Sequence, residues 1–206
     1  LNRLGIELIR EPAAGCCGAV SYHLAALDEG LNAMRRNIDA WWPQVENGAE
    51  AIIITASGCG AMVKDYGHAL KEDAAYAAKA AEISARARDI SEIFADEDLA
   101  PLRIDGDRKR IAFHSPCSLQ HGQQLGGVVE TLLTRLGFDL APVADAHLCC
   151  GSAGTYSRLQ PDLAQRLLAN NLSNLESSAP ELIATANVGC QLHLETRADR
   201  PVMHWI

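Results

Sequence analysis

The chain has 206 residues, of which 48% are hydrophobic, and its formal net charge is −8 at pH 7. A chain of this length forms one or two domains with a sizeable core. The acidic balance, without any Lys/Arg cluster, argues against nucleic acid as a partner. No apolar run approaches the roughly 18 residues that span a bilayer, so we expect a soluble piece of protein.

The first predicted elements are a strand at 5–9, a loop with Cys16-Cys17-Gly18 and an amphipathic helix. Along this helix, apolar side chains recur at spacings of three and four and so share one face. They are Leu24, Leu27, Leu31, Met34, Ile38 and Trp41. Turn residues then lead into a strand at 51–56, and Cys59 follows this strand.

The segment 71–95 predicts a linking amphipathic helix. Its apolar stripe consists of Tyr76, Ala80, Ile83, Ala87, Ile90 and Phe94. Such a stripe is either a docking surface for a partner subunit or a face packed on its own lobe. The packed face is favoured because apolar stripes usually belong to the core. Residues 100–109 predict an exposed link between two lobes.

The second half of the chain repeats the order of the first. In sequence it comprises a strand at 110–114, Cys117, a helix at about 123–136, a strand at 137–141, Cys149-Cys150-Gly151, a helix that begins at Pro161, a strand at 182–186 and Cys190. The order strand, loop, helix, strand predicts an α/β fold in which each lobe has a small parallel sheet and flanking helices. The cysteines then lie at the carboxyl ends of the strands, where open α/β sheets bind ligands.

The two halves are copies of one unit. Residues 1–8, Leu-Asn-Arg-Leu-Gly-Ile-Glu-Leu, return at 133–140 as Leu-Thr-Arg-Leu-Gly-Phe-Asp-Leu, and each copy leads to a Cys-Cys-Gly. The counterpart of Cys117 in the first copy would fall before Leu1. We therefore expect a piece of a longer protein, with an N-terminally truncated first lobe at 1–99 and a complete second lobe at 100–206.

All seven cysteines belong to the repeat, which indicates that they act together. Because adjacent cysteines make strained disulfides, thiolates held for a metal in a reducing compartment are the better interpretation. Structural zinc is commonly bound by two Cys-x-x-Cys knuckles, which are missing here, so scattered ligands favour an iron–sulfur cluster. The second lobe supplies four candidate ligands, Cys117, Cys149, Cys150 and Cys190. The first lobe supplies an incomplete set, Cys16, Cys17 and Cys59.

Glycines and histidines accompany the cysteines. We expect Gly18 and Gly151 to let the backbone approach an inorganic core and donate N–H groups to sulfide. His193 is either a cluster ligand or an ordinary histidine at a helix start. His114 and His147 either donate hydrogen bonds that tune a cluster potential or have a structural role, and the structural role is favoured. No catalytic motif is present in the sequence.

Two copies of a Cys…Cys-Cys-Gly…Cys pattern resemble the cysteine-rich CCG domain. This domain occurs in heterodisulfide reductases, in lactate-utilisation proteins, and in the iron–sulfur subunits of glycolate oxidase and anaerobic glycerol-3-phosphate dehydrogenase. Within this group, four stretches are most similar to the C-terminal half of the glycolate oxidase iron–sulfur subunits. They are residues 11–18 (Glu-Pro-Ala-Ala-Gly-Cys-Cys-Gly), 55–60 (Thr-Ala-Ser-Gly-Cys-Gly), 184–190 (Ala-Thr-Ala-Asn-Val-Gly-Cys) and 201–206 (Pro-Val-Met-His-Trp-Ile).

The resemblance implies an electron conduit. A partner subunit with bound FAD oxidises a 2-hydroxy acid, and clusters of the [4Fe-4S] or a non-cubane type pass the electrons toward a membrane quinone. The resemblance also implies a ferredoxin-like N-terminal part outside this chain and a cytoplasmic location, peripheral to the inner face of the membrane. Zinc in one lobe is the alternative metal. The chain alone is expected to have no catalytic residue.

The chain departs from the fullest family pattern, in which each motif ends in Cys-x-x-Cys. Met62 and His193 stand at the last position of the two motifs. This departure argues against a five-cysteine cluster and against the disulfide-cleaving chemistry of heterodisulfide reductase. An iron–sulfur electron-transfer subunit is favoured. The alternatives are a zinc-stabilised scaffold, a lactate-utilisation protein and a thiol–disulfide enzyme.

Overall fold

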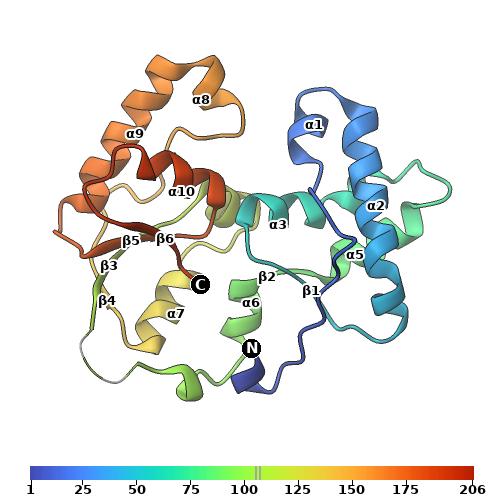
Figure 1. Cartoon of the computed structure of the whole chain (residues 1–206), viewed down its shortest axis with the longest axis horizontal. Helices are drawn as coiled ribbons and strands as arrows, with labels where there is room; N and C mark the ends of the chain where they lie inside the picture. The colour runs from blue at the N-terminus through green and yellow to red at the C-terminus, as the bar shows by residue number, and fades with distance from the viewer. Residues whose placement is uncertain (105, 107) are drawn as a thin grey trace. The chain divides into compact units, whose positions relative to one another are not determined.

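The computed structural model describes residues 1–104, 106 and 108–206, which form two compact units, Leu1–Ile90 and Ser91–Ile206 (Figure 1). Each unit contains one small sheet, and every strand pair in the two sheets is parallel. Helices flank both sheets, which confirms the predicted α/β class. No helix in the described part of the chain has the length and apolar character needed to cross a membrane.

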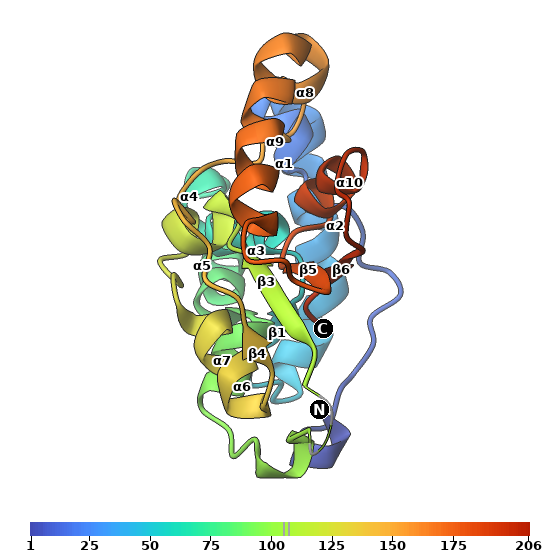
Figure 2. The ribbon, with the colours of Figure 1, turned by 90° about the vertical axis from the view of Figure 1, so that its left-hand side faces the viewer.

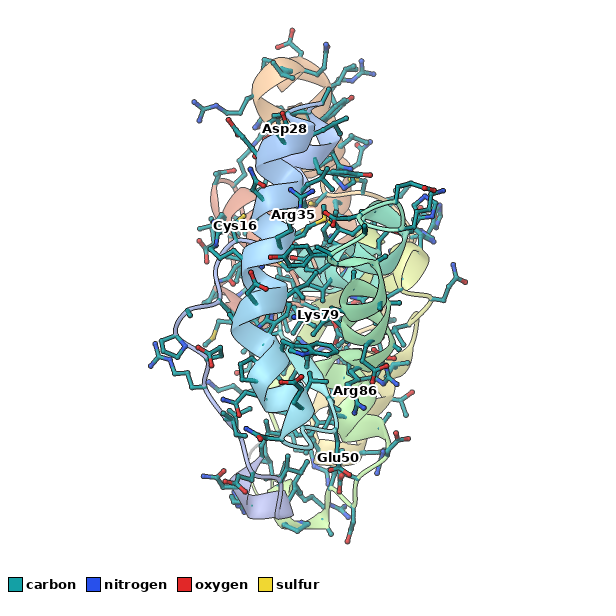
Figure 3. The ribbon with its side chains drawn as sticks, turned by 90° about the vertical axis from the view of Figure 1, so that its right-hand side faces the viewer. Cys16, Asp28, Arg35, Glu50, Lys79 and Arg86 are labelled. Carbon is teal, nitrogen blue, oxygen red and sulfur yellow. The ribbon has the colours of Figure 1, made fainter. Side chains whose placement is uncertain are left out.

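Unit 1 is mainly helical. Its elements are η1 (Asn2–Leu4), α1 (Ala19–His23), α2 (Leu27–Glu46), β1 (Ile52–Ile54), α3 (Ser57–Lys64), α4 (Tyr66–Ala69), α5 (Ala77–Arg86) and β2 (Ala87–Asp89). The predicted apolar stripe of α2 supplies Met34 and Ile38 to the core, and both are fully buried. Polar contacts add to this packing, since Arg35 of α2 pairs with Asp73 at 2.8 Å and the Lys79 ammonium of α5 lies 5.1 Å from the Trp42 ring centroid (Figure 3).

Two predicted elements of unit 1 are wrong. Residues 5–9 form no strand, and the sheet of the described part of unit 1 consists of β1 and β2 alone. The helix predicted over 71–95 is interrupted, since α5 ends at Arg86 and α6 begins at Ile90. Between them the chain extends as β2 to pair with β1. The apolar stripe is nevertheless core, because Ala80, Ile83 and Ala87 are fully buried.

Unit 2 is built on a four-stranded sheet of order β4-β3-β5-β6 (Figures 1 and 2). Its elements, with α6 beginning one residue before the unit, are α6 (Ile90–Ala95), η2 (Ala100–Leu102), β3 (Arg110–His114), the π-helical turn η3 (Ser118–Gly122), α7 (Val128–Leu136), β4 (Asp139–Leu140), α8 (Tyr156–Leu159), α9 (Pro161–Glu176), β5 (Leu182–Thr185), α10 (Val188–Glu195) and β6 (Val202–His204). The predicted bounds of β3 agree with the structure. Strand β6 was not predicted, and of the predicted link at 100–109, Asp105 and Asp107 lie outside the described residues.

The central strand β3 is covered on both faces. Ala112 packs into one apolar cluster with side chains of α9 and α10, whereas Ile111 and Phe113 pack into another with side chains of α7. Successive side chains of a strand point to opposite faces, which explains this alternation. The predicted helix at 123–136 begins only at Val128, because Gly127 at its N-cap has a left-handed φ of 82°. The sheet therefore fixes the end of β3 between two packed layers.

Candidate metal centre

The two Cys-Cys-Gly loops are held against the long helices α2 and α9 by their glycines. Gly18 and Gly151 have φ angles of 84° and 91°, in the left-handed region that favours glycine. A Cβ added at Gly151 would lie 2.5 Å from the Ala164 carbonyl oxygen of α9, and one at Gly18 would lie 2.7 Å from the Gly30 carbonyl oxygen of α2. The close approach that requires glycine is thus to a helix backbone. The Gly151 N–H does donate to sulfur, the Cys149 Sγ, at 3.3 Å.

Buried asparagines on these helices bind the backbone of the same loops. In unit 1, the Asn37 side chain accepts from the Gly15 N–H at 2.8 Å and donates to the Cys16 carbonyl at 3.0 Å. In unit 2, Asn171 donates to the Leu148 carbonyl at 3.1 Å. Both asparagines are almost completely buried. The sequence repeat aligns Asn37-Ile38 with Asn171-Leu172, but this contact with the loop was not predicted from it.

A buried tyrosine completes the support of the first loop. The Tyr66 hydroxyl accepts from Asn37 at 3.1 Å and donates to the Cys17 carbonyl at 2.9 Å, and the residue is fully buried. Burial raises the pKa of this phenol, so it remains protonated and able to donate at neutral pH.

We predict that Tyr66→Phe lowers the free energy of unfolding by about 1–3 kcal/mol, because the Cys17 carbonyl is left buried without its donor. The matched control is Tyr76→Phe, which removes an exposed hydrogen bond to Asp39 and should cost less than about 1 kcal/mol. Urea unfolding of both variants measures the difference. Equal losses would contradict the role assigned to Tyr66.

In unit 1 the structure brings the three predicted cysteines together. Cys59 lies in the first turn of α3, and its thiol donates to the Cys17 sulfur, which lowers the pKa of Cys17 to about 6. The same contact and burial raise the pKa of Cys59. The Cys16 thiol also contacts Cys17, although Cys16 is otherwise exposed (Figure 3). Met62, which stands at the last position of the first motif, lies in the core of the unit. Its side chain packs against apolar residues there.

In unit 2 the structure brings all four predicted cysteines together from three segments. Cys117 follows β3, Cys149 and Cys150 lie in the loop after β4, and Cys190 lies in the first turn of α10, which follows β5. Neighbouring thiols contact one another in a series from Cys117 through Cys149 and Cys150 to Cys190. The cysteines therefore gather at the carboxyl ends of parallel strands.

The contacts between these cysteines shift pKa values in opposite directions. Hydrogen bonds from the Cys117 and Cys150 thiols and from the Gly151 N–H lower the pKa of Cys149 to about 2. The contact with Cys149 and burial raise the pKa of Cys117, and contacts with Cys149 and Cys190 raise that of Cys150. The contacts therefore favour ionisation of Cys149 over its neighbours, and all of these thiols must be deprotonated when a metal binds.

A histidine joins the cysteines of unit 2. His114, at the end of β3, is 3% exposed, and one of its ring nitrogens lies within 4.8 Å of the Cys150 and Cys190 sulfurs. Its Nδ1 lies 2.9 Å from Oγ1 of Thr185. Burial lowers the pKa of His114 to about 4, so the imidazole is neutral at pH 7. The sequence assigned His114 a hydrogen-bonding role but did not predict Thr185 as its partner.

The other two histidines considered in the sequence differ in their surroundings. His193 lies on α10, and its Nε2 is buried without a hydrogen-bond partner in the described part of the chain. It remains outside the compact set formed by His114, Cys150 and Cys190. His147 is exposed in the loop before Cys149. Of the three histidines, His114 is therefore the one that the structure places within 4.8 Å of the sulfurs.

The same cysteine pattern decides the family. A model of the cysteine-rich domain, CCG, matches residues 1–64 and 111–195, which together cover more than half of the chain. The chain belongs to the cysteine-rich CCG domain family. The two matched segments contain all seven cysteines, so each unit of this CCG protein carries one copy of the domain pattern.

Several curated proteins are similar to this CCG chain over nearly its whole length. It is 57% identical over 206 residues to the glycolate oxidase iron–sulfur subunit of Escherichia coli and 26% identical over 202 residues to the probable glycolate oxidase iron–sulfur subunit of Bacillus subtilis. These alignments cover 100% and 97% of the chain, but 50% and 45% of the relatives. The chain thus spans about half the length of these two proteins.

A third relative is 26% identical over 208 residues, the lactate utilization protein A of Anoxybacillus flavithermus. That alignment covers 97% of the chain and 82% of the relative. The CCG pattern is therefore shared with proteins named for two different 2-hydroxy acids, and the higher identity is to the protein named for glycolate.

Proposed function

We propose that this chain is an iron–sulfur electron-transfer part of a glycolate-oxidising complex, with one cluster held in unit 2. The observation that carries the proposal is the convergence of four thiols from three strand ends of that unit. They are Cys117, Cys149, Cys150 and Cys190. The 57% identity to a protein named glycolate oxidase iron–sulfur subunit supports the choice of complex.

The donors of unit 2 fit an iron–sulfur cluster. Soft thiolates select such clusters, zinc or copper(I) over hard cations, and thiolates from several directions suit an object that has several irons. The sulfurs are close together although Cys117 and Cys190 are far apart in sequence. The Gly151 N–H already donates to the Cys149 sulfur, and such donors stabilise negative charge on a cluster. A cluster bound here supplies a one-electron carrier of the [4Fe-4S] or a non-cubane type.

The residues of unit 2 then hold and shield the carrier. Cys150 is 1% exposed and His114 is 3% exposed, so the inner side of the site is closed to water. Electrons would enter from a flavin-containing partner subunit that oxidises the 2-hydroxy acid and would leave toward a quinone at the membrane surface. We assign no step of substrate chemistry to this chain. Unit 1, with Cys16, Cys17 and Cys59, offers three thiols and therefore an incomplete set.

This function is tested by glycolate-dependent reduction. The complete iron–sulfur subunit that contains this chain is mixed anaerobically with its flavin-containing partner, and glycolate is added while the visible absorption and EPR signal of the cluster are recorded. We expect bleaching and a reduced-cluster signal with glycolate and none without the partner. A cluster that dithionite reduces but glycolate does not would reject the proposed electron path.

One observation favours a zinc-stabilised scaffold as the second candidate. Ligand atoms of His114, Cys150 and Cys190 all lie within 4.8 Å of one another, which is compact enough for a single tetrahedral ion. In that case the metal would fix three segments of unit 2 and contribute to its stability rather than carry electrons. Zinc protein is colourless, so metal analysis and the visible spectrum separate the two candidates.

A further inference from the structure

The side chains of Thr185 and His114 form a buried polar pair between two neighbouring strands of unit 2. The two residues are direct neighbours on the parallel strands β5 and β3, at the carboxyl end of both. Thr185 is 0% exposed and His114 is 3% exposed, and their side chains meet at 2.9 Å. Burying two polar side chains is costly unless each finds its partners, so the direction of this hydrogen bond is informative.

The proton of the Thr185 hydroxyl decides the direction of the hydrogen bond between Thr185 and His114. Among the described residues, Thr185 Oγ1 has one side-chain partner, the His114 Nδ1. If Nδ1 carried the ring proton, the buried hydroxyl proton would have no acceptor, which is unfavourable. If Thr185 donates instead, Nδ1 accepts and the neutral imidazole carries its proton on Nε2. The threonine thereby selects the tautomer in which Nε2 is a donor.

The sulfur atoms supply the acceptor for that proton. A ring nitrogen of His114 lies within 4.8 Å of the Cys150 and Cys190 sulfurs. The Thr185 hydroxyl already bonds to Nδ1, so we take Nε2 as the nitrogen that serves the sulfur pair. Thiolate sulfur accepts hydrogen bonds, and such bonds are among the factors that set cluster potentials.

We propose that Thr185 and His114 form a buried relay in which the threonine hydroxyl orients the imidazole and its Nε2–H donates to the Cys150 and Cys190 sulfurs of the cluster. His114 is then a positioning and tuning residue rather than a ligand. Reduction adds negative charge to the cluster, and the donated hydrogen bond stabilises that charge. The relay therefore raises the reduction potential. This inference rests on the proposed function, because it requires a cluster in unit 2.

The test compares three variants of the anaerobically purified 206-residue chain, each checked for iron and sulfide content. His114→Leu removes the donor, Thr185→Val removes the hydroxyl at nearly constant volume, and Thr185→Ser retains the hydroxyl. The midpoint potential of the unit 2 cluster is measured by EPR-monitored redox titration. We expect a shift to lower potential in His114→Leu, a smaller shift in the same direction in Thr185→Val, and the wild-type potential in Thr185→Ser. Nitrogen ENDOR of the wild-type cluster should show no directly bound nitrogen.

Three results would overturn the relay and are distinguishable from failure of the proposed function. A strong nitrogen coupling, lost in His114→Leu together with iron, would make His114 a ligand. An unchanged potential in Thr185→Val with the full cluster would show that the hydroxyl does not orient the ring. If His114→Leu does not fold, the potential of Thr185→Val alone tests the relay. Equal shifts in Thr185→Val and Thr185→Ser would assign the effect to packing. A wild-type 206-residue chain without iron and sulfide would reject the proposed function itself, and the relay with it.

Discussion

Replacing Cys150 with serine should remove the cluster from unit 2. Cys150 is 1% exposed and contacts both Cys149 and Cys190, so it occupies the middle of the sulfur series. A serine hydroxyl is a harder ligand with a shorter reach and remains protonated at neutral pH, so it replaces the thiolate poorly. We expect at least about a tenfold loss of affinity for the cluster, and iron and sulfide near zero in the purified variant.

The matched control is Cys16→Ser in unit 1. Cys16 is exposed and belongs to the three-thiol set, so its loss should change the iron content of this chain little. Both variants are purified anaerobically and analysed for iron and acid-labile sulfide per chain. Equal losses of iron from the two variants would contradict the assignment of the cluster to unit 2.

The second large effect is expected from Gly151→Ala. The added Cβ would meet the Ala164 carbonyl oxygen at 2.5 Å, and Gly151 has a φ of 91° that alanine adopts only with strain. The left-handed conformation costs an alanine about 1–2 kcal/mol, and overpacking against a fixed helix backbone adds about 1–3 kcal/mol. We therefore predict a loss of about 3 kcal/mol in the free energy of unfolding of unit 2, measured by urea unfolding.

Gly154→Ala isolates the backbone part of this cost. Gly154 lies in the same loop with a φ of 59°, but an added Cβ there would meet no atom within 4 Å. Only the conformational penalty of about 1 kcal/mol should remain. If both substitutions cost the same, the Cβ added at position 151 does not clash with the α9 backbone as the structure predicts.

Much of the fold was predictable, because in most segments the local sequence pattern agrees with the role of the segment in the folded chain. The apolar run Ile111–Phe113 lies between polar residues and forms the centre of β3, and Pro161 begins α9 as a first-turn proline should. The segment 71–95 was not predictable in this way. Its stripe at helical spacing is buried, but Ala87–Asp89 extends because it pairs with β1, and helical periodicity does not report a strand partner distant in sequence.

The candidate site shows the same division. The cysteines could be selected from sequence because soft sulfur ligands in a repeat carry their own chemical signal. The Thr185–His114 contact could not, because it depends on the register of two strands whose paired residues are 71 positions apart. The glycine of each Cys-Cys-Gly was also predictable as a close-approach residue, but its neighbour, the backbone of a long helix, appears only in the folded chain.

The most direct test of a cluster in unit 2 is the iron, acid-labile sulfide and zinc content of the anaerobically purified chain, with its visible spectrum. We predict brown protein with about four iron and four sulfide per chain, which corresponds to one cluster in unit 2. Stoichiometric zinc without sulfide, in colourless protein, would contradict the proposed electron carrier and would make unit 2 a structural metal scaffold.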